Sequence, residues 1–483
     1  MNILYTDDTI CAIATAQGGA IGTIRVSGKE AISITDKIFT PVNGAPLSER
    51  KPYTLTFGHI TNEGGEIVDE VLVSLFRGPH SYTGEDSTEI SCHGSSYILQ
   101  QVMQLLIKNG CRAAGPGEFT QRAFLNGKMD LSQAAAVADL IASTSASTHR
   151  MAMNQMRGGF SRELSALREK LLHLTSLMEL ELDFSDHEEL EFADRSELSE
   201  ITSQVETVIN GLVNSFSVGN AIKNGIPVAI IGETNAGKST LLNALLNEER
   251  AIVSDIHGTT RDVIEDTMNI NGILFRFIDT AGIRETTDTI ESLGIERSFQ
   301  KLDQASIVLW VIDSTEAKVQ IDALKDKVIP RCEGKKLILV MNKCDIANDA
   351  VIHSECLKDL PGATIINPIS VSGDSGMNYE VISIAAKQRK GIAELQKLLI
   401  KAAALPEVTQ NDVVVSNVRH YEALSHALEA IHRVQDGMSM GLSGDLVSQD
   451  LRECLFHLAE IVGGEITNDE VLGNIFKNFC IGK

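Results

Sequence analysis

The residues best placed to do chemistry lie in the octapeptide at 232–239, Gly-Glu-Thr-Asn-Ala-Gly-Lys-Ser, which fits the phosphate-binding pattern G-x-x-x-x-G-K-[ST]. Its glycines let backbone N–H groups turn toward a phosphate, because no Cβ stands in the way. We expect the Lys238 ammonium to reach the β- and γ-phosphates of a nucleotide, and the Ser239 hydroxyl to hold magnesium. An ordinary glycine-rich turn between a strand and a helix is the alternative, and the motifs that follow count against it.

Three short motifs downstream each follow an expected strand or lie between such strands. D-T-A-G at 279–282 offers an Asp that can hold magnesium through water and a Gly N–H for the γ-phosphate. N-K-x-D at 342–345 ends in a carboxylate that accepts from guanine N1–H and the exocyclic amine, and a site of this kind rejects the wrong base by about 10⁴. G-T-T-R-D at 258–262 offers a hydroxyl to the magnesium shell. In this order, the motifs predict a GTPase rather than an ATPase.

The turn that closes the guanine pocket has two candidates, Ser370-Val371-Ser372 and Ala385-Ala386-Lys387. We choose the second, because a strand-like run at 381–384 precedes it and Gly391 leads into an amphipathic helix. Its first Ala replaces the usual Ser. The stretch 367–379 is then expected to be a polar insertion in a loop.

The position after D-T-A-G, where Ras-type GTPases place a water-orienting Gln, holds Ile283. An isoleucine can neither orient water nor accept a proton. An arginine finger supplies about 10³–10⁵ in rate in such enzymes. This chain must therefore obtain equivalent help elsewhere or hydrolyse slowly.

The elements that position these motifs divide the chain into regions of different texture. Residues 1–126 mix strands, expected at 21–26 and 68–76, with a helix at 97–108, which indicates an α+β domain. Helical periodicity dominates 127–223 and returns over 405–483, whereas 224–404 carries the nucleotide motifs. The GTPase domain is therefore predicted to be inserted into a helical domain, with its two ends close together. The acidic stretch 183–192 is interpreted as a solvated loop.

Composition limits the class of protein. A chain of 483 residues with 43% hydrophobic residues is expected to fold into two to four domains. No apolar run reaches the roughly 20 residues of a membrane span, and the N-terminus lacks a basic cluster, so a cytoplasmic protein is expected. The eight cysteines form no C-x-x-C pair, so neither a zinc site nor a disulfide framework is indicated. The net charge is −23 and the sequence contains no basic stripe, so an RNA substrate is expected to bind largely through a basic partner.

Motifs outside the nucleotide site resemble those of the bacterial MnmE (TrmE) tRNA-modification GTPases over nearly the whole chain. They are G-T-I-R-V-S-G at 22–28, Y-T-G-E-D at 82–86, P-G-E-F-T at 116–120, R-A-F-L-N-G-K at 122–128 and the C-terminal C-I-G-K at 480–483. The resemblance implies an α+β N-terminal tetrahydrofolate-binding domain that also dimerises, an all-α helical domain and an inserted α/β P-loop GTPase domain.

The same resemblance implies partners and a reaction. The family works with the flavoprotein MnmG, which carries the FAD, in a heterotetramer or larger complex. Together they add an aminomethyl or carboxymethylaminomethyl group to C5 of the wobble uridine of certain tRNAs. The folate, as 5,10-methylenetetrahydrofolate or 5-formyltetrahydrofolate, maps onto Arg25, Glu89, Lys128 and Lys483, with the cations suited to its glutamate tail and Glu89 to the pterin. Cys480 is a candidate nucleophile; a small buried apolar residue is the alternative.

The resemblance also offers an answer to the missing Gln. Two GTPase domains of the family meet face to face around a potassium ion, where an arginine finger would otherwise lie. Asn235, Ser254, Ile256 and Thr259 match the potassium ligands, and Glu291 matches the water-orienting Glu. The full set of nucleotide-binding candidates is Asn235, Ala236, Gly237, Lys238, Ser239, Thr240, Ser254, Asp255, Ile256, His257, Gly258, Thr259, Thr260, Asp279, Thr280, Ala281, Gly282, Asn342, Lys343, Asp345, Ala385, Ala386 and Lys387; of these, Ser239 and Thr260 are the magnesium ligands.

Three other functions remain open from the residues. A ribosome-assembly GTPase of the Era or Der type shares the nucleotide motifs, but it should carry a basic RNA-binding domain or a second GTPase domain. A nucleotide-gated scaffold would bind GTP without turnover. A folate-dependent aminomethyltransferase would leave the GTPase domain unexplained.

Overall fold

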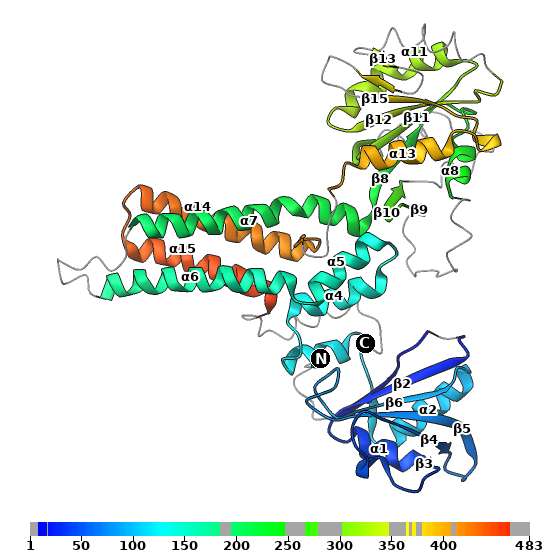
Figure 1. Ribbon diagram of the computed structural model, residues 1–483, viewed down its shortest axis with the longest axis vertical. Coiled ribbons are helices and arrows are strands. Elements are labelled where there is room, and N and C mark those ends of the chain that lie inside the picture. Colours follow the sequence, from blue (N-terminus) through cyan, green and yellow to red (C-terminus); the bar gives the residue numbers. More distant parts are fainter. Residues whose placement is uncertain are drawn as a thin grey trace. The chain divides into compact units, whose positions relative to one another are not determined.

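The chain forms two compact units in the computed structural model (Figure 1). One contains Met1–Ala142, Ala152–Gly211 and Glu422–Lys483, and the other contains Ser143–Met151 and Leu212–Tyr421. Among the described residues no helix has the length and apolar character needed to cross a membrane. The structure describes residues 8–16, 18–183, 195–246, 266–278, 302–346, 364–366, 370–372, 379–406 and 412–463.

The N-terminal part of the first unit is a seven-stranded sheet in the order β3-β4-β5-β6-β2-β1-β7. Helices α1 (Ala31–Ile38) and α2 (Ser96–Lys108) pack on one face, where alternate residues of the strands join Leu99 and Val102 in one core. The expected strands and the helix at 97–108 are confirmed. The strands are β1 (Thr9–Ile13), β2 (Ile21–Ser27), β3 (Phe39–Pro41), β4 (Thr54–Thr61), β5 (Ile67–Phe76), β6 (Ser87–His93) and β7 (Cys111–Ala113).

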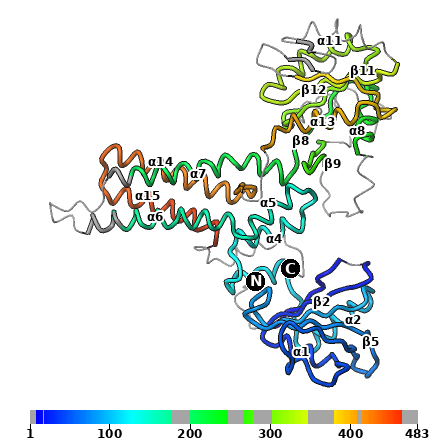
Figure 2. Tube along the Cα trace, viewed as in Figure 1, coloured from blue at the N-terminus to red at the C-terminus, as the bar shows by residue number. Residues whose placement is uncertain are grey.

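The rest of this unit is helical, and distant chain segments build it. Helices α6 and α15 lie side by side, as Figure 2 shows where the red end of the chain returns along the cyan segment. The periodicity predicted for α6 is confirmed, because Leu164, Leu171 and Leu174 are all buried. The helices are α3 (Glu118–Leu125), α4 (Leu131–Ala142), α5 (Ala146–Met156), α6 (Gly159–Asp183), α7 (Arg195–Asn224), α14 (Val418–Ser439) and α15 (Gly444–Val462); α5, α7 and α14 continue into the second unit.

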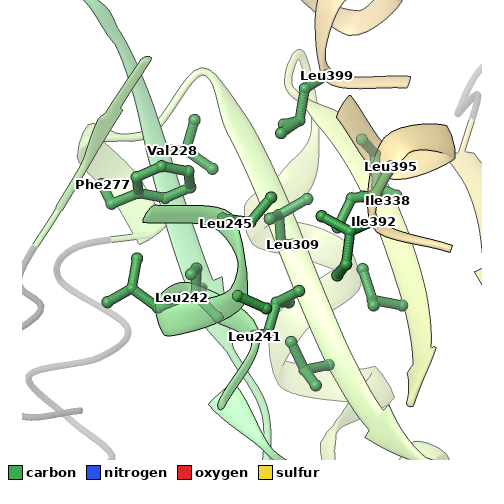
Figure 3. Packing of buried hydrophobic residues seen from close by; sticks show 14 of the residues in the cluster. Val228, Leu241, Leu242, Leu245, Phe277, Leu309, Ile338, Ile392, Leu395 and Leu399 are labelled. Carbon is green, nitrogen blue, oxygen red and sulfur yellow. The ribbon is translucent and has the colours of Figure 1, made fainter. Parts of the chain in front are cut away.

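The second unit contains a six-stranded sheet in the order β15-β12-β11-β8-β10-β9, in which only β9 runs antiparallel to its neighbour. Helices α8 and α13 cover one face, where Leu241, Leu245 and Leu395 pack on the strands (Figure 3), and α11 covers the other. The elements are β8 (Ile226–Ile231), α8 (Lys238–Leu246), β9 (Asp266–Ile270), β10 (Ile273–Phe277), β11 (Ile307–Asp313), α11 (Ala317–Val328), β12 (Lys336–Asn342), β15 (Tyr379–Ser383) and α13 (Ile392–Ala403).

The expected loop insertion at 367–379 is wrong in two places. Ser370–Ser372 forms β14, which pairs antiparallel with β13 (Thr364–Ile366), and Ile365 lies opposite Val371. Tyr379 begins β15 and is buried in the core on the α11 side. Polar residues surround β14 and the start of β15, so the sequence pattern did not indicate a strand at either place. Pairing with neighbouring strands determines the structure of both.

Candidate functional site

The phosphate-binding pattern forms the turn between β8 and α8, at the carboxyl edge of the parallel sheet. Gly232 and Gly237 have φ of 147° and 97°, which favour glycine. A Cβ on Gly232 would lie 2.2 Å from the Val311 carbonyl oxygen, and one on Gly237 would lie 2.1 Å from Nδ2 of Asn342. Both glycines are therefore required by backbone conformation and by close approach, which leaves a cradle that a side chain would fill.

Lys238 is the first residue of α8, and its ammonium bends back over the turn. Nζ donates to the carbonyl oxygens of Gly232 and Glu233, at 2.8 and 2.7 Å. Burial lowers the pKa of Lys238, and the charge of Glu233 opposes this shift. Ser239 and Thr240 follow in the first turn of α8, where the helix end carries partial positive charge. The turn thus presents an ammonium, hydroxyls and a helix N-terminus, which suits a phosphate.

Asn342 joins three loops at one point. Its Nδ2 donates to the Ala236 carbonyl at 2.9 Å, and its Oδ1 accepts from the Ala386 N–H at 3.1 Å. The side chain is buried, with Asn342 only 3% exposed. The structure therefore brings together the phosphate turn, the N-K-x-D turn and the Ala385–Lys387 turn, which are far apart in the sequence.

The other two side chains of N-K-x-D each have a partner. Nζ of Lys343 lies 2.5 Å from Oδ2 of Asp313, the last residue of β11. Oδ2 of Asp345 accepts from Nε2 of Gln388 at 2.9 Å. Sequence reasoning missed both Asp313 and Gln388. The sequence carried a signal for Asp313, because this acidic residue ends the otherwise apolar run 307–312; the structure adds that it lies opposite Asn342.

Several predicted residues lie outside the described part of the chain. They are Ser254, Asp255, Ile256, His257, Gly258, Thr259, Thr260, Asp279, Thr280, Ala281, Gly282, Glu291, Cys480 and Lys483. Of the predicted magnesium ligands only Ser239 lies among the described residues, and of the predicted potassium ligands only Asn235, whose φ is 63°.

In the N-terminal sheet, Arg25 of β2 lies opposite Glu89 of β6. Nε and a terminal nitrogen of Arg25 donate to Oε1 of Glu89, at 2.9 and 2.7 Å. The guanidinium carbon lies 5.2 Å from the ring centre of Tyr82 and 5.7 Å from that of Phe119. Arg25 and Glu89 therefore form one paired site, although the sequence assigned them to opposite ends of a folate.

Lys128 approaches the loop that carries Tyr82. Its Nζ donates to the Pro79 carbonyl at 2.9 Å, and its stem passes close to Gly84. Arg25 and Lys128 thus both contact the 79–86 loop, and Glu89 is paired with Arg25. The structure brings the three described folate candidates to this part of the N-terminal domain.

A charge network that sequence reasoning missed supports the same loop. Arg122 of α3 donates to Asp8 at 2.7 Å, to Glu118 at 3.0 Å and to Glu85 at 3.2 Å. Burial lowers the pKa of Arg122, but its acidic neighbours outweigh burial and raise it. Glu85 also accepts from the Ser27 hydroxyl at 2.8 Å. The network ties the loop to α3 and β2.

Cys92 and His93 have structural surroundings. The Cys92 thiol is buried and donates to the Gly22 carbonyl, and burial raises the pKa of Cys92 to about 11. Nδ1 of His93 lies 2.7 Å from Oδ1 of Asp69. Within the described ranges, no cluster of three or more His, Cys, Asp or Glu residues could hold a metal.

Comparisons with known proteins agree with this architecture. Residues 9–128 match the family model of the GTP-binding protein TrmE N-terminus, and residues 131–480 match the model of the MnmE helical domain. A protein of Bacteroides fragilis named tRNA modification GTPase MnmE is 69% identical, with 99% of each chain covered. Proteins of the same name from Parabacteroides distasonis and Flavobacterium johnsoniae are 63% and 50% identical, covering 98% and 99% of this chain and 100% of each relative.

Among solved structures, a variant of Era from Aquifex aeolicus bound to GDP and AlF4− is 28% identical over 42% of this chain and 66% of that chain, with a TM-score of 0.27. A TM-score this low supports no conclusion about this chain, whereas the full-length relatives and both family models identify its family. The chain belongs to the MnmE (TrmE) family, and it is a GTP hydrolase that acts in tRNA modification.

Proposed function

We propose that this GTPase is stimulated by potassium and works with the flavoprotein MnmG to add an aminomethyl or carboxymethylaminomethyl group to C5 of the wobble uridine. The proposed guanine site rests mainly on the Asn342 amide. This side chain links the phosphate turn at 232–239 to the turns at 342–345 and 385–387, which we call the base-side turns. In this proposal Asp345 reads guanine and Lys238 binds the β- and γ-phosphates. Gln388 leaves Asp345 when the base arrives.

The described residues fit a magnesium ion next to the nucleotide. The Ser239 hydroxyl lies in the first turn of α8, beside the cradle formed by Gly232 and Gly237. Ser239 and Thr260 would hold the ion, which supplies positive charge to phosphate oxygens when bound. Lys238 would neutralise the same oxygens from the protein side.

Asn235 supports the potassium proposal by its place in the turn. Its left-handed backbone sets it apart from a regular helical start, and its side-chain carbonyl is a suitable ligand for a hard cation. Asn235, Ser254, Ile256 and Thr259 would hold potassium, and Glu291 would orient the water. Two GTPase domains, one from each chain of a homodimer, would meet around this site.

The test is GTP turnover measured in potassium and in sodium at equal ionic strength. Asn235→Ala should remove the potassium stimulation while GDP affinity stays within about twofold, because the ion acts on the transition state. Asn243→Ala, an exposed asparagine on α8, is the matched control and should behave as wild type. Equal wild-type rates in both salts would overturn the potassium proposal, and undetectable turnover in both would favour a nucleotide-gated scaffold.

For the N-terminal domain we propose a tetrahydrofolate site at the Arg25–Glu89 pair, with Lys128 and Lys483 contributing. The Glu89 carboxylate, held by a guanidinium that itself lies over the Tyr82 ring, suits the N–H donors of a pterin. Glu89→Gln should weaken 5-formyltetrahydrofolate binding in calorimetry, whereas Glu70→Gln, an exposed carboxylate of β5, should not. Equal affinities for all three proteins would exclude Glu89 from the site.

The C-terminal residues are proposed to serve modification rather than GTP hydrolysis. Deleting 480–483, which removes Cys480 and Lys483, should abolish wobble-uridine modification while GTP turnover persists. Mass spectrometry of tRNA nucleosides from a complemented deletion strain measures the first, and phosphate release measures the second. Retained modification would refute the assignment.

A further inference from the structure

The turn that reads the base contains a strained residue. Lys343 has φ of 64°, in the left-handed region that L-residues rarely adopt. This conformation directs the chain from the end of β12 toward Asp345, two residues later. Backbone hydrogen bonds hold this turn in part, because the Cys344 N–H donates to the Ile384 carbonyl and the Ile346 N–H to the Lys343 carbonyl, both at 3.1 Å. A contact on the Lys343 side chain would further restrict where Asp345 lies.

Asp313 is placed to hold the 342–345 turn through the Lys343 side chain. Asp313 is only 6% exposed, and its Oδ1 accepts from both the N–H and the hydroxyl of Thr315, at 3.0 and 2.7 Å. Its own N–H donates to Oε1 of Gln320 at 2.9 Å. The carboxylate is therefore fixed on β11, and Oδ2 is directed to Nζ of Lys343.

The neighbouring backbones are also in register. Asp313 lies opposite Asn342 in the parallel pair, and the Ser314 N–H donates to the Asn342 carbonyl at 2.9 Å. The Lys343 side chain is about one third exposed, whereas the Asp313 side chain is buried, so a partly accessible ammonium pairs with a buried carboxylate. An anchored charge beside a strained residue can offset the strain.

We infer that Asp313 is a positioning residue for guanine recognition: its ion pair with Lys343 holds the 342–345 turn in the conformation that reads the base. Asp313 touches the nucleotide only through Lys343. This inference rests on the proposed guanine site, and it adds a residue and a physical role to that site.

The test uses Asp313→Asn, which keeps the size but removes the charge. Asp322→Asn is the matched control, because Asp322 also pairs with a lysine, Lys325, at 2.7 Å in the same domain but in an exposed position. Affinities for GTP, GDP and ITP are measured by competition with a fluorescent guanine nucleotide. ITP lacks the exocyclic amine that Asp345 would read.

We expect Asp313→Asn to weaken GTP and GDP binding about tenfold, which is ~1.4 kcal/mol, with kcat at saturating GTP within about twofold. The preference for GTP over ITP should shrink, because a displaced Asp345 no longer distinguishes them. Asp322→Asn should match wild type. Unchanged affinities, or a loss that leaves the GTP/ITP ratio intact, would overturn the inference, since a purely structural role would leave that ratio unchanged.

A double-mutant cycle isolates the pair. In a Lys343→Met background, Asp313→Asn should cause less than about a twofold further loss, because the partner is already gone. Full additivity would contradict the inference. If Asp313→Asn fails to fold, as judged by circular dichroism, Lys343→Met tests the same pair through the GTP/ITP ratio. A wild-type protein without guanine preference would instead overturn the proposed site itself.

Discussion

Replacing Asn342 with Ala is the most demanding test of the nucleotide site. The substitution removes a buried amide and leaves two backbone groups, the Ala236 carbonyl and the Ala386 N–H, without their partner. Each unsatisfied buried group costs about 1–3 kcal/mol. The sum is roughly 2–6 kcal/mol, and it falls on the three turns that must be ordered when a nucleotide binds.

We therefore expect Asn342→Ala to weaken GDP and GTP binding by at least about 30-fold, the factor that corresponds to ~2 kcal/mol. Asn342→Asp keeps an acceptor for Ala386 but sets a carboxylate against the Ala236 carbonyl, so it should be no better. Gln388→Ala removes one exposed hydrogen bond near the same pocket and should change affinity by less than about threefold.

The assay is displacement of a fluorescent guanine nucleotide, followed by thermal unfolding of each variant without nucleotide. Wild-type affinity for Asn342→Ala would refute the argument that this amide assembles the pocket. Equal losses of nucleotide affinity for Asn342→Ala and Gln388→Ala would also refute it, because a buried and an exposed hydrogen bond would then contribute equally to binding.

Three further outcomes follow from described contacts. Gly237→Ala should abolish nucleotide binding, since its Cβ would meet Asn342 and its φ disfavours alanine; retained binding in calorimetry would contradict this. Arg122→Ala should lower the free energy of unfolding by about 1.5–3 kcal/mol in denaturant titration, because Glu85 loses its cation while Asp8 and Glu118 keep only Arg112. Burial beside Arg419 and Lys223 lowers the pKa of His420 to about 3. Between pH ~6.5 and pH ~3 the unfolded state therefore binds a proton that the folded state does not. The free energy of unfolding should fall by up to about 1.4 kcal/mol per pH unit as the pH is lowered through this range. His420→Phe should flatten that slope relative to wild type.

Sequence patterns predicted helices, strands and turns well where neighbouring residues alone determine the local structure. The alternation of β5, the three- and four-residue spacing of α6 and the phosphate turn after β8 all depend on neighbours within a few residues. The short strand at 370–372 was missed because its structure depends on pairing with 364–366.

The missed site residues share a physical reason. Asp313 meets Lys343 across 30 residues, Gln388 meets Asp345 across 43, and Arg122 meets Glu85 across 37. No spacing rule encodes such pairs, because they form only when the fold brings together loops, helices and strand ends that are distant in the sequence. The motifs were visible in the sequence; the residues that hold them in place were not.

The single amide of Asn342 has a thermodynamic consequence. Because one side chain connects the phosphate turn to the base-side turns, the two halves of a nucleotide do not bind as independent fragments. We expect whichever half binds first to restrict the remaining motion of all three turns, so that the second half binds to a site already organised. Guanosine and pyrophosphate, added as separate molecules, are therefore linked ligands, each raising the affinity of the other by the same factor.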